Sequence, residues 1–477
     1  MTSNTYTFPV LSIIRAFAIV AIINSAFNFT YSNIQTNCYP FSPYSMKLKF
    51  ILLFTLTIIF CQLVAAQSKL KAIKAGKVID VVSGTVLNQQ VILIDSNTIV
   101  NIGAGLAIPA NAEVIDLSNA TVLPGLIDCH THITSQPSGD YYGDIFRKTP
   151  MDYAVTAHIY AKRTLQAGFT TCRDVGAAAF IDVALRNAIN SGEIEGPRLQ
   201  VATLFIGSTG SHGDLNGFSP FLSFQLPKEM MGVADGIDAL RKQVRYNIKY
   251  GADVIKFGAG AGVLSEEESV GAPQFSLEEM KAIVEEAKMW GRKTCAHAHG
   301  TDAIKQAIRA GVASVEHGSF LDAEAIQLMK QQGTYLVADI YNDDYIMSEY
   351  KRLGYPQKIL DKEQLVGRTQ RESFAKAVKG GVKIAYGTDA GVYPHGWNGK
   401  QFYYMVKYGL TPIQAIQAAT INAADLLGWK ERVGSITKGK WADIIAIEGN
   451  PLDDVTLLEK VKFVMKDGKV YKNELKK

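Results

Sequence analysis

Two histidines end an apolar segment in the first third of the chain. Residues 124–133 read PGLIDCHTHI, which places His130 and His132 two positions apart. Side chains two apart on a β-strand point to the same face of the sheet, so both imidazoles would face the same space. Two imidazoles on one face can bind a single metal ion. A lone buried histidine is more often a hydrogen-bonded core residue, so a metal site requires further ligands from elsewhere.

Candidate partners lie at the ends of other short apolar segments. A lysine inside an apolar strand loses much hydration free energy on burial. It could face solvent, pair with a carboxylate, or react with CO2 to give a carbamate that bridges two cations. The aspartate in AYGTDAG could simply end a turn. Each of these residues has an ordinary structural explanation, but all of those explanations would have to be true at once, at equivalent positions of different repeats. A metal site is therefore favoured. The residues are Lys256, His297, His299, His317 and Asp389.

The segments that carry these residues alternate with amphipathic helical patterns over residues 123–431. Eight strand candidates occur there, and stretches such as SLEEMKAIVEEAKMWG and TDAIKQAIRAG lie between them. Eight such repeats predict an α/β fold, a (β/α)8 TIM barrel, with functional residues at the carboxyl ends of its strands. A doubly wound sheet is the alternative, but no GxGxxG opens a strand–helix turn here.

Both ends of the mature chain have a different texture. Residues 67–122 and 432–477 contain short apolar strands separated by Gly, Asn and Asp, as in antiparallel β-structure. We therefore expect both ends to join in one small β-sandwich domain beside the barrel.

The N-terminal region resembles a targeting segment. Met46 opens MKLKFILLFTLTIIFCQLVAAQS, a basic start, an apolar run and small residues at Ala65 and Ala66. This is the layout of a secretory signal peptide over residues 46–66, and the apolar run is short for a bilayer span. Residues 1–45 are then an upstream segment that was wrongly assigned to the protein. We expect a secreted or periplasmic protein without stable membrane insertion after cleavage.

Charge, cysteine usage and the lack of one motif exclude several classes of protein. The net charge of +4 includes three basic and no acidic residues before Gln67, so the remainder has no basic stripe for nucleic acid. Three cysteines remain after Gln67, none in a CxxC pair, so neither a disulfide framework nor a cysteine zinc site is expected. GxSxG is absent, which argues against a serine hydrolase.

Taken together, LPGLIDCHTH, the strand lysine, HAHG, VEHG and GTDAG resemble the metal-dependent amidohydrolase superfamily. The segment LTPIQAIQAATINAADLLGWKERVGSITKGKWADIIAI is similar to the C-terminal part of that superfamily, and the resemblance covers residues 69–477. IKFGAGAGVLSEEESVGAPQFS, AHAHG and GSTGSHGD most resemble bacterial Xaa-Pro dipeptidases and related aminoacyl-amide hydrolases.

The resemblance implies two divalent metal ions, for which the donor types suit Zn2+. Lys256, carboxylated by CO2, would bridge both ions together with a hydroxide. Asp389 would accept the proton of the nucleophile and pass it to the leaving nitrogen. The implied ligand sets are His130, His132 and Asp389 for one ion and His297 and His317 for the other.

The implied reaction is hydrolysis of the C–N amide bond of a small molecule, either an Xaa-Pro-like dipeptide or an N-acyl amino acid. A cyclic amide of the imidazolone type or a lactone is the alternative, and a non-catalytic binding protein is a third possibility. Superfamily members often form homo-oligomers, but nothing in the sequence specifies an interface.

Several further side chains could contact substrate. His299 shares a face with His297, and His212 follows the third strand. Tyr341 follows the seventh strand, where packing of the ring is slightly favoured over contact with substrate, and His395 lies in the loop after the eighth. Arg173 and Asp174, adjacent at the end of the second strand, are expected to pair with each other.

Overall fold

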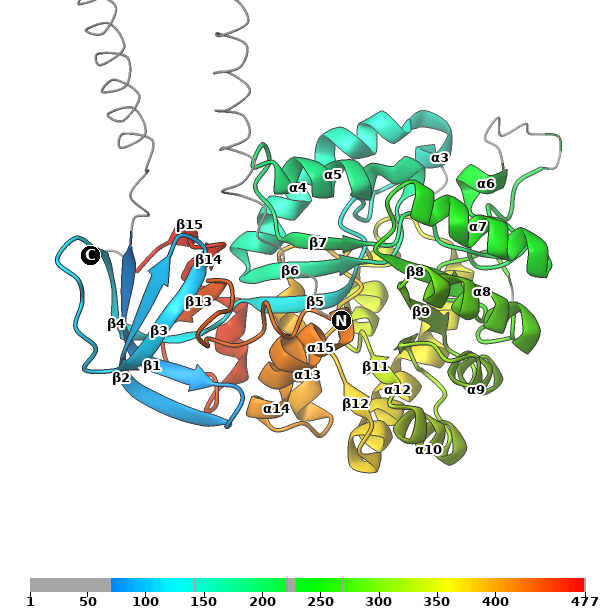
Figure 1. The fold of residues 1–477 in the computed structure, drawn as a ribbon. Coiled ribbons are helices and arrows are strands. Elements are labelled where there is room, and N and C mark those ends of the chain that lie inside the picture. Colours follow the sequence, from blue (N-terminus) through cyan, green and yellow to red (C-terminus); the bar gives the residue numbers. More distant parts are fainter. Residues whose placement is uncertain (1–69, 141–142, 220, 222–227, 268, 476–477) are drawn as a thin grey trace, which may run out of the picture. The chain divides into compact units, whose positions relative to one another are not determined.

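The computed structural model describes residues 70–140, 143–219, 221, 228–267 and 269–475 (Figure 1). Residues 68–477 form one compact unit. The proposed upstream segment, 1–45, and the predicted signal peptide, 46–66, lie outside the described residues. Within the described ranges, no helix has the length and apolar character needed to cross a bilayer.

Eight parallel strands form the centre of the unit, in the order in which the sequence predicts them. Strands β5 to β7 form one sheet in the order β5-β6-β7, and the other five form a second in the order β12-β11-β10-β9-β8. Most of their residues are buried, as expected for parallel strands covered by helices. The strands are β5 (Leu126–Thr131), β6 (Phe169–Asp174), β7 (Arg198–Val201), β8 (Val254–Gly258), β9 (Lys293–Ala298), β10 (Ser314–His317), β11 (Tyr335–Val337) and β12 (Lys383–Ile384).

The two parallel sheets are linked at both edges. A parallel bridge joins Thr131 at the end of β5 to Ala390 beyond β12. A second parallel bridge joins Ile206, beyond β7, to Phe257 in β8. The chain therefore has a TIM-barrel-like α/β arrangement, in which the carboxyl ends of all eight strands face the same side.

Helices cover the outer side of these strands, and α7 to α10 lie side by side in Figure 1. Helix α8 begins where the sequence predicts, because Ser276 and Glu279 form a reciprocal capping box. The helices are α3 (Gly143–Arg147), α4 (Pro150–Gln166), α5 (Ile181–Asn190), α6 (Lys228–Met231), α7 (Ile237–Lys249), α8 (Leu277–Met289), α9 (Thr301–Ala310), α10 (Ala323–Gln332), α11 (Asn342–Tyr345), α12 (Gln357–Gly380), α13 (Gln401–Lys407), α14 (Pro412–Gln417) and α15 (Ala423–Leu427).

Strands from both ends of the described chain form a separate sheet, in the order β15-β14-β13-β4-β1-β2-β3. Pairing connects all seven strands in one sheet, so the two-layered form of the predicted β-sandwich stays a prediction. The expectation of purely antiparallel pairing is wrong, because β1 and β4 pair in parallel. The hairpin β2–β3 serves as the long connection that parallel neighbours require. The strands are β1 (Lys71–Asp80), β2 (Thr85–Asp95), β3 (Thr98–Ala104), β4 (Glu113–Pro124), β13 (Ile444–Ile447), β14 (Phe463–Lys466) and β15 (Lys469–Asn473).

Arg198 connects this sheet to the parallel strands. Its guanidinium donates to Asp443 at 2.6 Å and to Asp467 at 2.5 Å, and lies 4.2 Å from the ring centre of Trp441. The side chains of Arg198 and Asp443 are only 11% and 3% exposed. An ion pair this buried is strongly destabilised when one partner is removed.

We expect Arg198→Ala to lower the free energy of unfolding by about 3–5 kcal/mol, because Asp443 would stay buried without its cation. Urea denaturation measures this loss. Arg368→Ala is the control, since that side chain is 88% exposed and its pair with Glu372 contributes about 0–1 kcal/mol. Equal, small losses for the two variants would contradict the structural role of Arg198.

Candidate active site

A cavity of about 400 Å³ lies at the carboxyl ends of the parallel strands. It collects most of the side chains that the sequence singled out, although they come from positions far apart in the chain. The described residues of its lining include all six predicted ligands and two predicted substrate contacts. These eight residues are His130, His132, His212, Lys256, His297, His299, His317 and Asp389.

The ligand-type side chains form three overlapping groups, each with its donor atoms within 4.8 Å of one another. The first contains His130, His132 and Asp389. The second contains His297, His299 and His317, and a third joins His317 and Asp389 to Asp339. The sequence predicts His299 as a substrate contact. In the structure its imidazole also has the position of a metal ligand, beside His297 and His317.

Five of the six imidazoles in the described lining of the cavity have a contact at Nδ1, which leaves Nε2 of each as the second donor position. In metal sites, such a contact fixes the ring orientation and its tautomer. The contacts are His130 with Glu316 (2.8 Å), His132 with the carbonyl of Gly176 (2.9 Å), His212 with Ser265 (2.7 Å), His299 with Ser319 (2.7 Å) and His317 with Asp339 (2.8 Å).

Two buried atoms of the predicted metal ligands have no hydrogen-bond partner among the described residues. They are Nε2 of His297 and Oδ1 of Asp389. Oδ1 of Asp389 also lies 3.4 Å from Nε2 of His130 and 3.5 Å from Nε2 of His132. Buried polar atoms are almost always satisfied, so unpartnered donors of this kind fit divalent metal ions bound among imidazole and carboxylate ligands.

Desolvation keeps most of these imidazoles neutral, which is the form that binds metal. It lowers the pKa of His132 to about 4 and those of His297 and His317 well below the usual value. His130 is the exception. Desolvation and the charge of Lys256 lower its pKa, but Asp389 and Glu316 outweigh them and the net shift is upward. Asp389 and Glu316 thus favour a positive charge on the ring of His130, and a metal cation bound at Nε2 would supply that charge in place of a proton.

Two residues at the site have a left-handed backbone conformation. His317 has φ of 68° and Asp389 has φ of 56°. This region is unfavourable for residues other than glycine and costs about 1–3 kcal/mol for each residue. The direction of these two side chains is therefore obtained at a cost in folding free energy, as expected of functional residues.

Comparison with known proteins identifies the family. Residues 121–471 match the amidohydrolase family. The chain belongs to this family.

Individual amidohydrolases resemble the chain over most of its length. Ochratoxinase from Aspergillus niger is 33% identical over 436 residues, which cover 85% of this chain and 87% of that protein. A crystal structure of an Xaa-Pro dipeptidase with methionine bound in its active site superimposes with a TM-score of 0.82 and 41% identity. That match covers 85% of this chain and 100% of the other. A prolidase complexed with N-methylphosphonate-L-proline gives a TM-score of 0.79 and 29% identity, with coverage of 85% and 100%.

These matches establish a hydrolase that acts on carbon–nitrogen amide bonds and resembles Xaa-Pro dipeptidases. They also agree with the TIM-barrel-like α/β arrangement of the strands. Members of the family are typically metal-dependent, which agrees with the groups of His and Asp side chains in the cavity.

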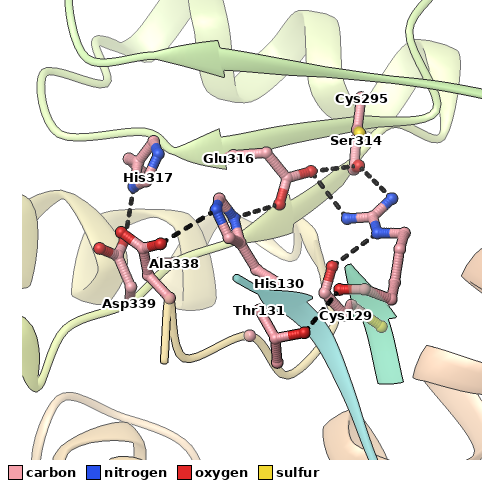
Figure 2. Close-up of polar contacts among 12 residues, drawn as sticks. Cys129, His130, Thr131, Cys295, Ser314, Glu316, His317, Ala338 and Asp339 are labelled. Carbon is pink, nitrogen blue, oxygen red and sulfur yellow. Dashed lines mark hydrogen bonds and ion pairs between the residues drawn. The ribbon is translucent and has the colours of Figure 1, made fainter. Parts of the chain in front are cut away.

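Sequence reasoning missed Glu316, the buried carboxylate that orients His130 in this amidohydrolase. Figure 2 shows Glu316 between His130 and Ser314. Glu316 also accepts a 2.8 Å hydrogen bond from Arg173, so the predicted Arg173–Asp174 pair is wrong. Asp174 instead accepts from the backbone N–H of Ile133. A charged residue inside the buried strand segment ASVEHGS was the available signal.

The charge state of Glu316 follows from this geometry. Burial alone would raise the pKa of Glu316, but the charge of Arg173 and the hydrogen bond with His130 contribute to a larger combined effect that lowers the pKa below the usual range. Glu316 is therefore an anion, and it accepts a hydrogen bond from the Nδ1–H group of His130.

Asp339 was also missed, although it lies two residues beyond β11 at the same edge as the predicted ligands. It accepts from His317 (2.8 Å), from Nε2 of Gln370 in α12 (2.7 Å) and from Nδ2 of Asn342 in α11 (2.7 Å). Its position in TYLVADIY, after a buried strand, could have identified it. The amides of Gln370 and Asn342 come from helices whose distance from the strands no local pattern reveals.

Lys256 lies within β8 and is buried, with no hydrogen bond or ion pair to its Nζ atom among the described residues. Nζ lies 5.7 Å from the ring centre of Phe205. Within the described residues, Lys256 therefore neither faces solvent nor contacts a carboxylate directly. Neither of these two explanations, which the sequence left open, applies.

The structure does not bring Tyr341 and His395 into the described lining of the cavity. The ring of Tyr341 packs against Tyr393, with ring centres 4.9 Å apart. His395 stacks on Tyr160 and contacts the carbonyl oxygen of Ser135 through Nε2 at 2.7 Å. Both side chains are therefore used in packing around the site.

We expect Glu316→Gln to lower zinc affinity by about 10–100-fold, since the orienting partner of His130 loses its charge. It should also lower the free energy of unfolding by about 3–5 kcal/mol, because Arg173 stays buried without an anion. Titration against a competing chelator and urea denaturation measure the two effects. Glu324→Gln, at an exposed pair with Lys305, is the control. Unchanged affinity in Glu316→Gln would refute its role in orienting His130.

Proposed function

We propose that this amidohydrolase uses two divalent metal ions, most suitably Zn2+, to hydrolyse the C–N amide bond of small dipeptides of the Xaa-Pro type or of N-acyl amino acids. The observation that carries the proposal is the pair of unpartnered atoms, Nε2 of His297 and Oδ1 of Asp389, in one cavity with the buried Lys256. The first two of the three ligand groups share no residue, which supports two ions.

His130, His132 and Asp389 would hold one ion, and His297 and His317 the other, with Lys256 between them. Bound there, the metal ions would supply Lewis acidity at the scissile carbonyl and lower the pKa of water. The imidazole and carboxylate donor set suits zinc. His299 and His212 complete the wall beside His297, whose ring stacks on that of His212 with centres 4.1 Å apart.

Lys256 would act as N6-carboxylysine. The ammonium group of Lys256 would first lose one proton to give the neutral amine. The amine Nζ would then form a bond to the carbon of CO2 and release a second proton, so that a cation becomes an anion. The lack of a direct carboxylate partner supports this assignment, because an uncompensated ammonium is unfavourable in a buried site. The product would have two oxygen donors.

Asp389 would carry the proton during the reaction. Burial raises the pKa of this carboxyl, but the interactions with His130 and His132 together outweigh burial and the net shift is downward. Asp389 is therefore ionised at neutral pH, and its Oδ1 atom can accept a proton from the attacking water. Delivery of that proton to the amide nitrogen lets the nitrogen leave as an amine.

The substrate class rests on the relatives. The Xaa-Pro dipeptidase and the prolidase complex are named for proline-containing substrates or ligands, and both resemble this chain over their whole length. The ochratoxinase is named for a different substrate, so the amide bond is the common element and the substrate is the variable one.

The remaining expectations from the sequence are part of the same proposal. They comprise closure of the eight strands into a (β/α)8 barrel over residues 123–431 and a two-layered β-domain from residues 67–122 and 432–477. They also include export to the periplasm or medium after cleavage of residues 46–66, and association of copies of the chain. The bridges at Thr131 and Ile206 support barrel closure.

Hydrolysis of a panel of Xaa-Pro dipeptides, other dipeptides and N-acyl amino acids by zinc-loaded protein tests the substrate class. The metal content of the same sample is measured by mass spectrometry. We expect about two ions per chain and cleavage of Xaa-Pro peptides. Two ions without cleavage of any of these substrates would contradict the substrate class, and the search would move to lactams and lactones. Absence of bound metal would contradict the mechanism.

Lys256→Ala should reduce the metal content from about two ions per chain to about one or fewer and abolish turnover, because the bridging anion is lost. In the wild-type protein, 13C-labelled bicarbonate should give a carbamate carbonyl resonance that the variant lacks. Lys249→Ala, at the end of α7 and outside the described lining of the cavity, is the control. Normal metal content and activity in Lys256→Ala would refute the bridging role.

A further inference from the structure

One acidic side chain in the cavity has no role in the arrangement described above. Glu363 lies in α12, lines the cavity and is 3% exposed. Its carboxyl group has no hydrogen bond or ion pair within the part of the chain that the structure describes. Buried carboxyl groups without a partner are unusual, so a binding partner from outside the protein would explain it.

Helix α12 presents Glu363 to the cavity together with Val366 and Gln370, which are three and seven residues further along the same helical face. Gln370 is already engaged, since its amide donates to Asp339. Val366 and Ile346 make the nearby wall apolar. This wall thus combines one free acidic group with aliphatic surface, as needed for an amino acid residue with a charged amine and an apolar side chain.

Asn342 provides a second and independent observation. Its Nδ2 atom donates to Asp339 at 2.7 Å and approaches Asp389 at 3.4 Å, which fixes the orientation of the amide. Its Oδ1 atom is buried and has no hydrogen-bond partner in the described part of the chain. Asn342 lines the same cavity, so an unused acceptor lies next to Asp389 at the reaction centre.

The electrostatic surroundings favour a cation at this wall. Burial, together with the charges of Asp343 and Asp339, raises the pKa of Glu363 well above the usual range. The cation Arg371 is occupied by Asp343 at 3.0 Å and by Asp344 at 2.6 Å. An ammonium group of a ligand would compensate the acidic groups at this wall.

We propose that Glu363 and Asn342 bind the α-ammonium group of the substrate's N-terminal residue, so that free dipeptides are preferred over N-acyl amino acids. This inference rests on the proposed function and narrows it to one of the two substrate classes. In a dipeptide, the ammonium nitrogen lies about 2.5 Å from the scissile carbonyl carbon. Its binding site must therefore adjoin the reaction centre, as Asn342 adjoins Asp389.

The test uses two substrates that differ only in the amine, L-leucyl-L-proline and 4-methylpentanoyl-L-proline. We expect wild-type zinc-loaded protein to favour leucyl-proline in kcat/KM by at least about 10–100-fold, because the analogue leaves the polar groups unpaired. In Glu363→Gln, the ratio of the two kcat/KM values should fall to near one. Glutamine has the size of glutamate and is uncharged, like the protonated form of Glu363, so the fold should be retained.

Two controls separate recognition of the amine from a general effect on structure. Glu372→Gln changes an exposed glutamate of the same helix that pairs with Arg368, and should leave the ratio as in the wild type. Glu363→Asp keeps the acidic group on a shorter side chain and should restore part of the preference. A wild-type ratio near one, or an equal loss on both substrates in Glu363→Gln, would overturn the inference.

If the wild-type protein cleaves neither compound, the proposed peptide substrate is wrong. A binding measurement then tests whether the cavity recognises an ammonium group. Calorimetric titration with L-leucine and with 4-methylpentanoate, which lacks only the amine, then gives the preference directly. Tighter binding of leucine that depends on Glu363 would support the ammonium site without the peptidase assignment. Equal binding of the two compounds, or no binding of leucine, would overturn it.

Discussion

The desolvated ion pair between Arg173 and Glu316 is the interaction on which the site depends. It connects β6 to β10, and through His130 it reaches β5, so three strands share one charge network. A buried ion pair is favourable only when its geometry is excellent and its remaining polar atoms are satisfied. Here the guanidinium also donates to the carbonyl of Cys129 and to Ser314, and Glu316 accepts from three side chains.

This network explains how an apolar interior can contain so many histidines. Five of the six rings in the described lining have one nitrogen engaged by a carboxylate, hydroxyl or carbonyl oxygen, which fixes the direction of the other nitrogen. Desolvation keeps most of the rings neutral, and the unfavourable backbone of His317 and Asp389 shows that packing outweighs local conformational preference. The wall formed by α12, which carries Glu363, then extends this polar interior to a region that metal ligation does not need.

Local periodicity made much of this predictable. His130 and His132 could be assigned to one face because alternation along a strand is a property of the backbone. The eight parallel strands and the start of α8 follow from equally local signals, namely apolar runs, turn residues and a capping box. Local signals failed where pairing was not local. Arg173 has Asp174 beside it in sequence, yet its partner lies 143 residues away in β10.

The sequence by itself determined the residue types, the strand ends at which they occur and hence the kind of chemistry, because these depend on patterns a few residues long. Only the tertiary structure decided which buried polar atoms of the described residues remain unpaired, as with His297, Asp389 and Asn342. Whether a buried donor or acceptor is satisfied depends on side chains that converge from several strands and helices, and the same residue can be structural or functional according to what it meets there.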